Sequence, residues 1–516
     1  MRIGIDFGTS FSKAAAVDVF GNPVVLKYDV GVNQTIPSVF YFDRDRGKRI
    51  GREAERLAQS GLKDNLIRDI KLKLTDGRGD VATTVLDGVS FDSVSVVAAI
   101  LGFVEGVAEK AAAQRGFDER IDAAVVTIPV QFNTFEKRCV LRAMQTPKEQ
   151  GGPGLRVLGL LKEPIAAALS YCWDDPIEDG GNVLVYDLGG GTCDVAVVRA
   201  DSSADGRFVE VASDMIRVGG RDWDNRLLEY VNDEVSASEG RLILPPQTDL
   251  RAVAIQCKEA LSDETQATMS FGILKDEAYA LHEIDVTREQ FEHMTEDILQ
   301  ETMTVVDDVI RRLAPADRRS ISRIVCVGGS SNMPQVRSRL QELFPNAKVL
   351  LHQPEYAVAR GAALYAAHCE EGTDPERYVR GKSSSSYGIC VHDYGSDKDY
   401  IRNLITVGDE LGTVARVRLR TPPQGSYADA PVRIFENDST DTRCEMYQAF
   451  GGGAPICSFD LDFGGRQVGA GTPFEFAMTL DASGLLRVTV TGGSGEELAT
   501  YTVGADRGGN RKEGEA

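Results

Sequence analysis

The sequence predicts a two-lobed α/β domain followed by an all-β sandwich, and three observations carry that prediction. Strand-like and helix-like segments alternate through about residue 368. Two segments of this region, RIGIDFGTSFSKAAAVD and VLVYDLGGGTCDVAVVRAD, share one design: an apolar strand ends in Asp, a Gly-Thr turn follows, and a second apolar strand begins. Beyond a polar, serine-rich stretch, helical periodicity disappears. The repeated hairpin predicts two lobes, each opened by one hairpin.

Composition bounds the class of protein. A chain of 516 residues exceeds what one core usually organises, so two or more domains are expected. The formal net charge of -21 argues against a nucleic-acid partner, because lysine and arginine must neutralise phosphates. The nine cysteines stand singly with no CxxC, which indicates neither a disulfide framework nor a zinc site and favours small buried thiols in the cytoplasm. The opening MRIGIDFG, with no basic leader or long apolar run, predicts a protein that is neither secreted nor membrane-spanning.

Periodicity places the other elements of the α/β region in order. Apolar spacing predicts a long helix over residues 91–116 that stops at Gly116. A second helix, over 222–235, puts Trp223, Leu227 and Val231 on one face. The remaining predicted elements are buried strands within 121–132 and 321–327 and a helix over 335–344, into which the turn Gly328-Gly329-Ser330 leads.

The predicted domain boundaries follow changes in composition. The α/β domain covers 1–368, and the polar segment 369–386 is a connection between domains. A β-sandwich is predicted over 387–505, and a disordered tail over 506–516.

Alternating apolar residues predict the strands of the sandwich. The segment PFEFAMTLDASGLLRVTV turns at 481–484 and resumes as a second strand, which predicts a hairpin with one buried face. Short strands are also predicted at APVRIFEND and NLITVGDEL. The side chains predicted to face the core are Phe474, Phe476, Met478, Leu480, Leu486, Val488 and Val490.

The glycine turns predict a site for a nucleotide's phosphates. Backbone N–H groups that converge at a tight turn bind phosphate well, and glycine lets the backbone come close. The carboxylates of Asp6 and Asp187 would repel phosphate directly, so a hydrated Mg²⁺ is the partner that their position favours. One such turn is equally well explained as a structural hairpin. Three turns, in DFGTS, DLGGGT and VGGSSNMP, are hard to explain structurally.

These segments resemble the 70-kDa heat-shock chaperone family (DnaK-like), which belongs to the actin-like ATPase superfamily. The resemblance runs in order through IGIDFGTS, VVTIPVQFN, LLKEPIAAALSY, VYDLGGGTCDVAVV, RVGGRDWDNRLLEYV, CKEALS, VGGSSNMPQV and QPEYAVARGAALYAA, and it covers essentially all of the first 368 residues. It implies an actin-like ATPase domain that uses ATP or ADP with Mg²⁺. The β-region looks like the family's peptide-binding sandwich.

The resemblance also implies roles for residues at the phosphate end. Asp6 and Asp187 would hold Mg²⁺ through waters, and Lys71 would stabilise charge on the γ-phosphate, with Lys73 as a rival because the local match is loose. Glu163 and Asp194 would position the attacking water, although each has a structural alternative, for Glu163 as a carboxylate at a helix N-terminus. The residues that would cradle the β- and γ-phosphates are Gly8, Thr9, Ser10, Gly189, Gly190, Gly191 and Thr192.

Further roles are implied at the nucleoside end of the site. Lys258 and Ser262 would border adenine, but they could equally form a solvated helix face. Glu355 matches an acidic position near the nucleotide, or it caps the helix that follows. Pro129 matches a proline that couples nucleotide state to the second domain, or it simply ends a strand. The turn residues Gly328, Gly329 and Ser330 would lie against the ribose and the α-phosphate.

The chain departs from the family's pattern at several places. Ile255 stands where an acidic residue is usual in the adenine pocket, Asn332 stands where arginine is usual, and Arg221 replaces an acidic residue in the GGxDxD segment. The segment DPERYVRGKSSSS does not resemble the family's leucine-rich acidic linker. The β-region is not followed by a helical lid, so a lidless, divergent member is expected.

Two functions are weighed first. One is a cytoplasmic ATPase and chaperone that binds unfolded or extended polypeptide in its β-domain, with co-chaperones as possible partners. The other is an ATP-dependent switch or scaffold that recognises one dedicated protein partner. A sugar-kinase-like phosphotransferase would need a catalytic base facing a hydroxyl substrate, for which no motif is found, and the appended β-domain makes an actin-like filament less natural. Neither nucleic acid nor membrane is expected as a partner.

Overall fold

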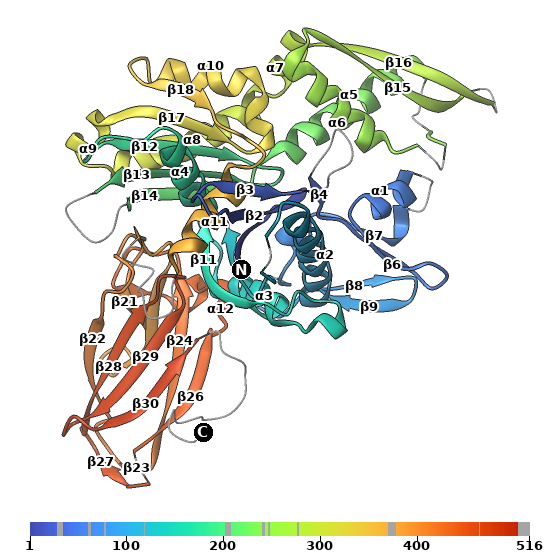
Figure 1. Ribbon diagram of the computed structural model, residues 1–516. Coiled ribbons are helices and arrows are strands. Elements are labelled where there is room, and N and C mark those ends of the chain that lie inside the picture. The colour runs from blue at the N-terminus through green and yellow to red at the C-terminus, as the bar shows by residue number, and fades with distance from the viewer. Residues whose placement is uncertain are drawn as a thin grey trace.

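The computed structural model describes residues 1–27, 35–59, 63–76, 79–117, 119–201, 208–239, 243–245, 248–275, 278–369, 378–463 and 465–503. The predicted disordered tail lies outside these residues, as do residues 370–377 of the predicted linker. Two α/β lobes sit side by side, and a β-domain projects from them (Figure 1). In the described part of the chain, no helix is long and apolar enough to cross a membrane.

The first lobe is built on a mixed sheet in the order β11-β10-β1-β2-β3, with β4 paired to β2. Its first two strands form the predicted antiparallel hairpin, while β1, β10 and β11 run parallel. The long predicted helix is confirmed as α2, with Asp92 accepting a hydrogen bond from Ser95 N at its start and Gly116 at φ 79° just beyond its end. The bounds in this lobe are β1 (Arg2–Phe7), β2 (Phe11–Val17), β3 (Pro23–Leu26), β4 (Ile36–Pro37), β5 (Phe40–Asp43), β6 (Gly47–Ile50), α1 (Arg52–Gln59), β7 (Leu66–Ile67), β8 (Thr83–Leu86), β9 (Val89–Asp92), α2 (Ser93–Gln114), β10 (Ala123–Ile128), α3 (Thr134–Gln145) and β11 (Arg156–Lys162).

The second lobe repeats this plan in the order β18-β17-β12-β13-β14-β19. The second predicted hairpin is β12–β13, which is antiparallel, and β17 runs parallel to β12. Trp223, Leu227 and Val231 are fully buried on one face of α5, as predicted. The bounds are β12 (Asn182–Leu188), β13 (Cys193–Ala200), β14 (Phe208–Ile216), α5 (Gly220–Glu239), α6 (Leu250–Asp263), β15 (Gln266–Lys275), β16 (Ala278–Thr287), α7 (Arg288–Met294), α8 (Glu296–Arg312), α9 (Pro315–Arg319), β17 (Ile321–Val327), α10 (Pro334–Leu343), β18 (Lys348–Leu351) and β19 (Val379–Arg380).

Two helices lie between the sheets, α4 (Glu163–Asp174) and α11 (Ala357–His368). They bury small apolar side chains, mostly alanine, against strands of both lobes. Glycine allows the closest approaches. A Cβ atom added to Gly361 would lie 1.6 Å from Ala166 O in α4, and one added to Gly4 would lie 2.1 Å from Ala363 N in α11. These helices therefore join the lobes through backbone contact.

The β-domain is a sandwich of two sheets, in the orders β25-β21-β20-β24-β26 and β22-β28-β29-β30. The predicted hairpin is β28–β29, and its predicted core residues are all buried. The predicted strand NLITVGDEL is wrong beyond Ile405, because Gly408 at φ 92° turns the chain. The bounds are β20 (Ser386–Asp393), β21 (Lys398–Ile405), β22 (Ala415–Arg420), β23 (Ser426–Tyr427), β24 (Asp429–Asn437), β25 (Arg443–Cys444), α12 (Phe450–Gly453), β26 (Cys457–Asp462), β27 (Val468–Gly469), β28 (Pro473–Leu480), β29 (Leu486–Gly492) and β30 (Glu497–Thr502).

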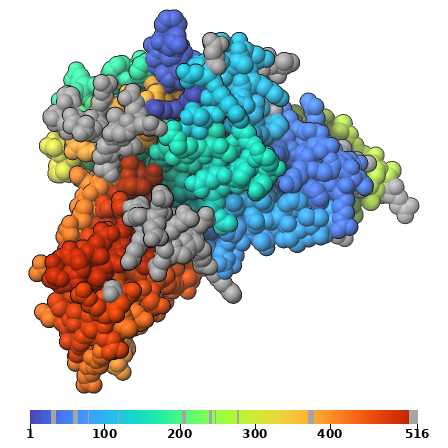
Figure 2. Space-filling model, turned by 60° about the horizontal axis from the view of Figure 1, so that its bottom comes forward, coloured from blue at the N-terminus to red at the C-terminus, as the bar shows by residue number. Residues whose placement is uncertain are grey.

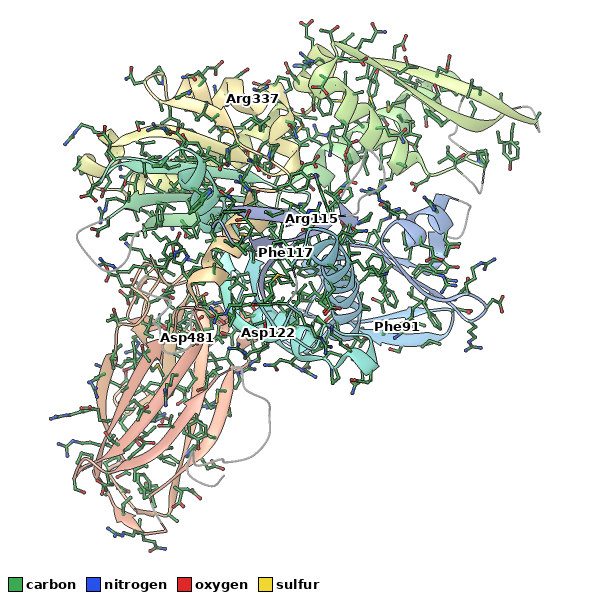
Figure 3. All side chains as sticks on the ribbon, in the orientation of Figure 1. Phe91, Arg115, Phe117, Asp122, Arg337 and Asp481 are labelled. Atoms are coloured by element: carbon green, nitrogen blue, oxygen red, sulfur yellow. The ribbon has the colours of Figure 1, made fainter. Side chains whose placement is uncertain are left out.

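The β-domain packs against the α/β lobes at one end. Figure 2 shows its orange and red surface meeting the teal surface of the first lobe, and Figure 3 places Asp481 at the end of the β-domain that faces the lobes. The chain enters the β-domain through β19, which pairs in parallel with β14 through Phe208–Val379 and Val209–Arg380. Two residues within the predicted linker, Val379 and Arg380, therefore form a strand of the second lobe's sheet.

Candidate nucleotide-binding site

The two glycine turns predicted to bind phosphate lie against each other where the lobes meet. Each turn directly follows the first strand of its hairpin, β1 or β12. A Cβ atom added to Gly190 would lie 2.2 Å from Ser10 Oγ, and one added to Gly191 would lie 3.1 Å from Thr9 Cγ2. The repeated hairpin thus brings two distant turns to one place. The turns comprise Gly8, Thr9 and Ser10 in one lobe and Gly189, Gly190, Gly191 and Thr192 in the other.

Lys71 lies in the middle of this site. It belongs to the short 3₁₀ turn Ile70–Leu72, and its side chain is 2% exposed and ion-paired with Glu163. Its Nζ atom lies 5.8 Å from the ring centroid of Phe7 and 6.0 Å from that of Phe132. Lys73, the rival in the sequence, is exposed. Of the two lysines, Lys71 is the one that reaches the glycine turns' neighbourhood.

Glu163 and Asp194 flank this lysine and are both buried. Burial raises the pKa of Glu163 to about 7, although the ammonium of Lys71 opposes the shift. Asp194 accepts a hydrogen bond of 2.7 Å from Val130 N, and Val130 follows Pro129 just beyond the end of β10. Burial raises the pKa of Asp194 while that hydrogen bond lowers it. Two carboxylates with perturbed pKa values beside a buried lysine are typical of a reactive site.

The charges of the site fit a cation. Asp187 is 5% exposed, and burial raises its pKa well above the usual range, with Glu163 and Asp194 raising it further. Asp6 pairs with Lys13 at 3.1 Å. Four carboxylates thus face two ammonium groups, so two negative charges are unmatched when all four carboxylates are ionised, and a bound cation would favour that ionised form. Among the described residues no three acidic, histidine or cysteine side chains are grouped to chelate a metal directly. A hydrated Mg²⁺, which usually keeps several waters, suits this surplus.

The third glycine turn packs on the second. Gly328 has φ 80°, and a Cβ atom there would lie 2.6 Å from Asp187 Oδ1. Ser330 Oγ donates to Gly189 O at 3.1 Å. The helix predicted over 335–344 is confirmed as α10, which begins at Pro334, and the turn leads into it through the 3₁₀ turn Gly329–Asn332.

The predicted nucleoside-end residues are only partly gathered. Lys258 Nζ lies 2.7 Å from the Asp224 carboxylate and donates to Gly220 O at 2.9 Å, which places it beside the third turn. The hydroxyl of Ser262 bonds to a carbonyl of its own helix. Glu355 is exposed and lies two residues before α11, which begins at Ala357, so a position near the nucleotide and a charge at the start of this helix both stay predictions.

Three charged residues that pair with site residues were not predicted from the sequence. Lys13 lies directly opposite Asp6 in the β1–β2 register, a pairing that counting back from the turn could have found. Asp224 could not be paired with its lysine from spacing alone because they lie on different helices. The departure Arg221 lies 3.7 Å from Asp69 of the first lobe, so its charge is matched across the lobes. The other departures are a half-buried Ile255 and Asn332, whose Nδ2 donates to Gly329 O at 2.8 Å.

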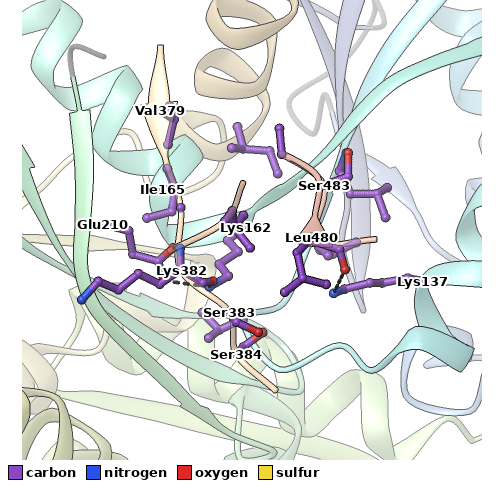
Figure 4. Close-up of a pocket in the computed structure, with 18 of the residues that line it drawn as sticks. Lys137, Lys162, Ile165, Glu210, Val379, Lys382, Ser383, Ser384, Leu480 and Ser483 are labelled. Carbon is purple, nitrogen blue, oxygen red and sulfur yellow. Dashed lines mark hydrogen bonds and ion pairs between the residues drawn. The ribbon is translucent and has the colours of Figure 1, made fainter. Parts of the chain in front are cut away.

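A cavity of about 40 Å³ lies where the lobes meet the β-domain (Figure 4). Lys162 Nζ crosses it, 2.7 Å from Glu210 Oε1 and 2.8 Å from Lys382 O. Lys137 Nζ donates to Gly484 O at 3.1 Å, and burial lowers the pKa of this lysine. Side chains of the first lobe therefore hold backbone groups of both the linker and the β-domain.

Comparisons with known proteins agree with this geometry. Residues 2–389 match the family described as Hsp70 protein. "Chaperone protein HscA homolog" of Acidovorax sp. (strain JS42) is 33% identical over 382 residues, which cover 71% of this chain and 58% of that protein. The protein of the same name from Acidovorax ebreus (strain TPSY) is 32% identical over 382 residues, with the same coverage. This chain thus aligns with 58% of the length of these relatives. The chain belongs to the Hsp70 family, and its α/β lobes have the actin-like fold of that family.

Proposed function

We propose that this chain binds ATP between its two lobes and hydrolyses it slowly, and that its β-domain binds extended polypeptide. The observation that carries the proposal is the meeting of the two glycine turns beside the buried Lys71–Glu163 pair. Bound Mg²⁺ would supply positive charge to the phosphate oxygens, and Asp6 and Asp187 would hold it through waters. This is the activity that membership of the family also favours.

Each residue at the phosphate end of the site has a role that follows from its position. Backbone N–H groups of the two turns bind the β- and γ-phosphates. Lys71 stabilises negative charge on the γ-phosphate as it grows, and its ion pair with Glu163 holds it in place. Glu163 and Asp194 orient the attacking water, for which an ionised carboxylate is the better acceptor.

The nucleoside end uses weaker contacts. Gly328, Gly329 and Ser330 lie against the ribose and the α-phosphate, and Lys258 borders the adenine with its ammonium already neutralised by Asp224. Ser262 and Glu355 complete this end. Because Ser262 is committed to its own helix, it offers the base chiefly a surface.

The proposal is tested by single-turnover ATP hydrolysis on the full chain, with and without a panel of extended apolar peptides. Acceleration by peptide supports an ATPase whose β-domain is a substrate site. No hydrolysis at any peptide concentration overturns the ATPase assignment. Hydrolysis at a rate that no peptide changes overturns the proposed coupling between peptide binding and ATP hydrolysis, and it supports the second candidate function given below.

The second candidate is an ATP-dependent switch whose β-domain recognises one dedicated protein partner. The polar linker favours it, since Val379 and Arg380 within this segment pair with β14 of the second lobe. A peptide array separates the candidates. Broad binding of short apolar peptides supports a general chaperone, and binding of none of them supports a dedicated partner.

A further inference from the structure

Strand β22 forms an open edge of the β-domain. It pairs with β28 on one side only, and in Figure 1 it lies at the outer side of the domain. Within the described residues, no backbone hydrogen bond joins its other side to any segment. An exposed edge of this kind presents unpaired N–H and C=O groups to which another strand can add.

The outer face of this strand is strongly basic. Side chains alternate along a strand, so Arg416, Arg418 and Arg420 share one face, and the first two side chains are 60% and 86% exposed. Glu475 on β28 accepts from Arg416 at 3.0 Å and from Arg418 at 3.2 Å, while Arg420 donates to Gly471 O at 3.1 Å. Two of the three arginines share this one carboxylate and the third has a neutral carbonyl partner, which leaves a local charge of +2 on a chain of net charge -21.

The opposite face of the strand is anchored. Val417 is buried in the sandwich core, and Leu419 packs against that core. The strand is therefore held in an extended conformation before any partner arrives, and less ordering is required when one binds.

We infer that the open edge of β22 binds an acidic, extended polypeptide segment as an added strand. The backbone groups of the edge supply main-chain hydrogen bonds, and the arginines supply charge-assisted hydrogen bonds to carboxylates on alternate residues of the segment. With six residues, the edge spans about 20 Å and accommodates a partner of similar length. This site is separate from the nucleotide site and does not depend on hydrolysis.

Other occupants fit less well. Two copies of this chain meeting edge to edge would bring six arginines together, so the charges that attract an acidic strand also prevent self-association. A nucleic acid offers phosphates but no strand to pair, and the overall charge repels it. An anionic membrane likewise has no strand to pair with the edge.

The test measures fluorescence anisotropy with the full chain and a labelled ten-residue peptide of alternating Glu and Val. We expect the double variant Arg416→Glu, Arg418→Glu to weaken binding by at least about tenfold, because each attraction becomes a repulsion. Arg418→Gln, which adds no new charge, is expected to weaken it less, and serves if the double variant folds poorly. The control Arg311→Glu alters a side chain of 71% exposure in α8 and leaves binding unchanged.

Two further arms separate strand addition from simple attraction. A peptide that is N-methylated along one edge keeps its charge but loses the main-chain donors of that edge. Two such peptides are tested, one methylated along each edge, and we expect one of them not to bind. Unlabelled apolar peptide must not compete, and Lys71→Ala must bind the acidic peptide unchanged, which separates this proposal from the proposed function. Equal binding by the double variant, indifference to N-methylation at both edges, or tighter binding of a single-stranded oligonucleotide or of phosphatidylserine vesicles overturns it.

Discussion

Lys71 and Glu163 are buried against each other, and the opposite charge of each one reduces the free-energy cost of burying the other. A lone charge of either sign in that position would cost several kcal/mol or would change its protonation. Burial has in fact raised the pKa of Glu163 to about 7 despite its lysine partner. The pair is therefore poised between two charge states near neutral pH.

Replacing Lys71 by alanine is expected to slow single-turnover hydrolysis by about 10²–10³-fold, because a positioned positive charge is lost from the transition state. The matched control is Lys73→Ala, two residues away on the exposed side of the same turn, which should change the rate by less than about twofold. Equal rates in the Lys71 variant and the unchanged chain would remove this lysine from the mechanism.

Glu163 predicts a pH dependence of stability in the nucleotide-free chain. Its pKa is raised in the folded state from 4.5 to about 7, so its stabilising protonation is complete below 4.5 and is lost as pH rises through about 7. Glu163→Gln cannot titrate. The Tm of the unchanged chain should therefore fall relative to that of Glu163→Gln between about pH 5 and about pH 8. A Tm difference independent of pH would contradict the shift.

At the scale of elements, α4 and α11 hold the lobes together through close backbone contact. Alanine and glycine let these helices pack at a distance that larger side chains forbid. The segments EPIAAAL and ARGAALYAA are therefore packing segments as much as family signatures. Their small residues fix where Glu163, the first residue of α4, stands.

The substitution Gly361→Ala should destabilise the fold by about 1–3 kcal/mol, because its Cβ would fall 1.6 Å from Ala166 O, and backbone must move. Gly106→Ala in α2 is the matched control. Its Cβ would meet nothing within 4 Å, so this variant should be stabilised by roughly 0.5–1 kcal/mol. Chemical unfolding of both variants measures the contrast, and a neutral Gly361→Ala would show that the helices can separate freely.

Helices and strands were predicted well from the sequence where a single periodicity of apolar residues determines the element and its buried face. The core face of α5 and the β28–β29 hairpin needed only local spacing, and both are confirmed. Contacts between elements were harder. The Lys258–Asp224 pair joins two helices whose relative rotation no spacing reveals, and the strand predicted over NLITVGDEL ended early because Gly408 adopts a positive φ. The three glycine turns were found because turn chemistry is local, while their meeting depends on the packing of whole lobes.

At the scale of the whole molecule, Glu436 ties the β-domain to the first lobe. Its side chain is fully buried, and it accepts from Thr134 N at 2.7 Å and from Tyr387 OH at 2.9 Å. Ser483 Oγ accepts from Leu160 N at 3.0 Å nearby. The junction is thus built from hydrogen bonds that would be left unpaired if the domains parted without water.

Glu436→Ala should loosen this junction, since each hydrogen bond to a charged group contributes about 1.5–3 kcal/mol. We expect a larger radius of gyration by small-angle X-ray scattering and faster proteolysis next to β19. Asp460→Ala, an exposed carboxylate on β26, is the control and should change neither. An unaltered radius of gyration in the Glu436 variant, with folding verified by circular dichroism, would show that other contacts hold the domains.

The parallel pairing of β19 with β14 has a consequence for how such proteins diverge. Main-chain hydrogen bonds do not depend on which side chains a strand carries, so the connecting segment can change from apolar to polar over evolutionary time and still attach to the same sheet edge. Searches that look for a leucine-rich connector would pass over such chains. The pairing sets the geometry of the attachment and leaves the side chains of the connecting segment free to differ.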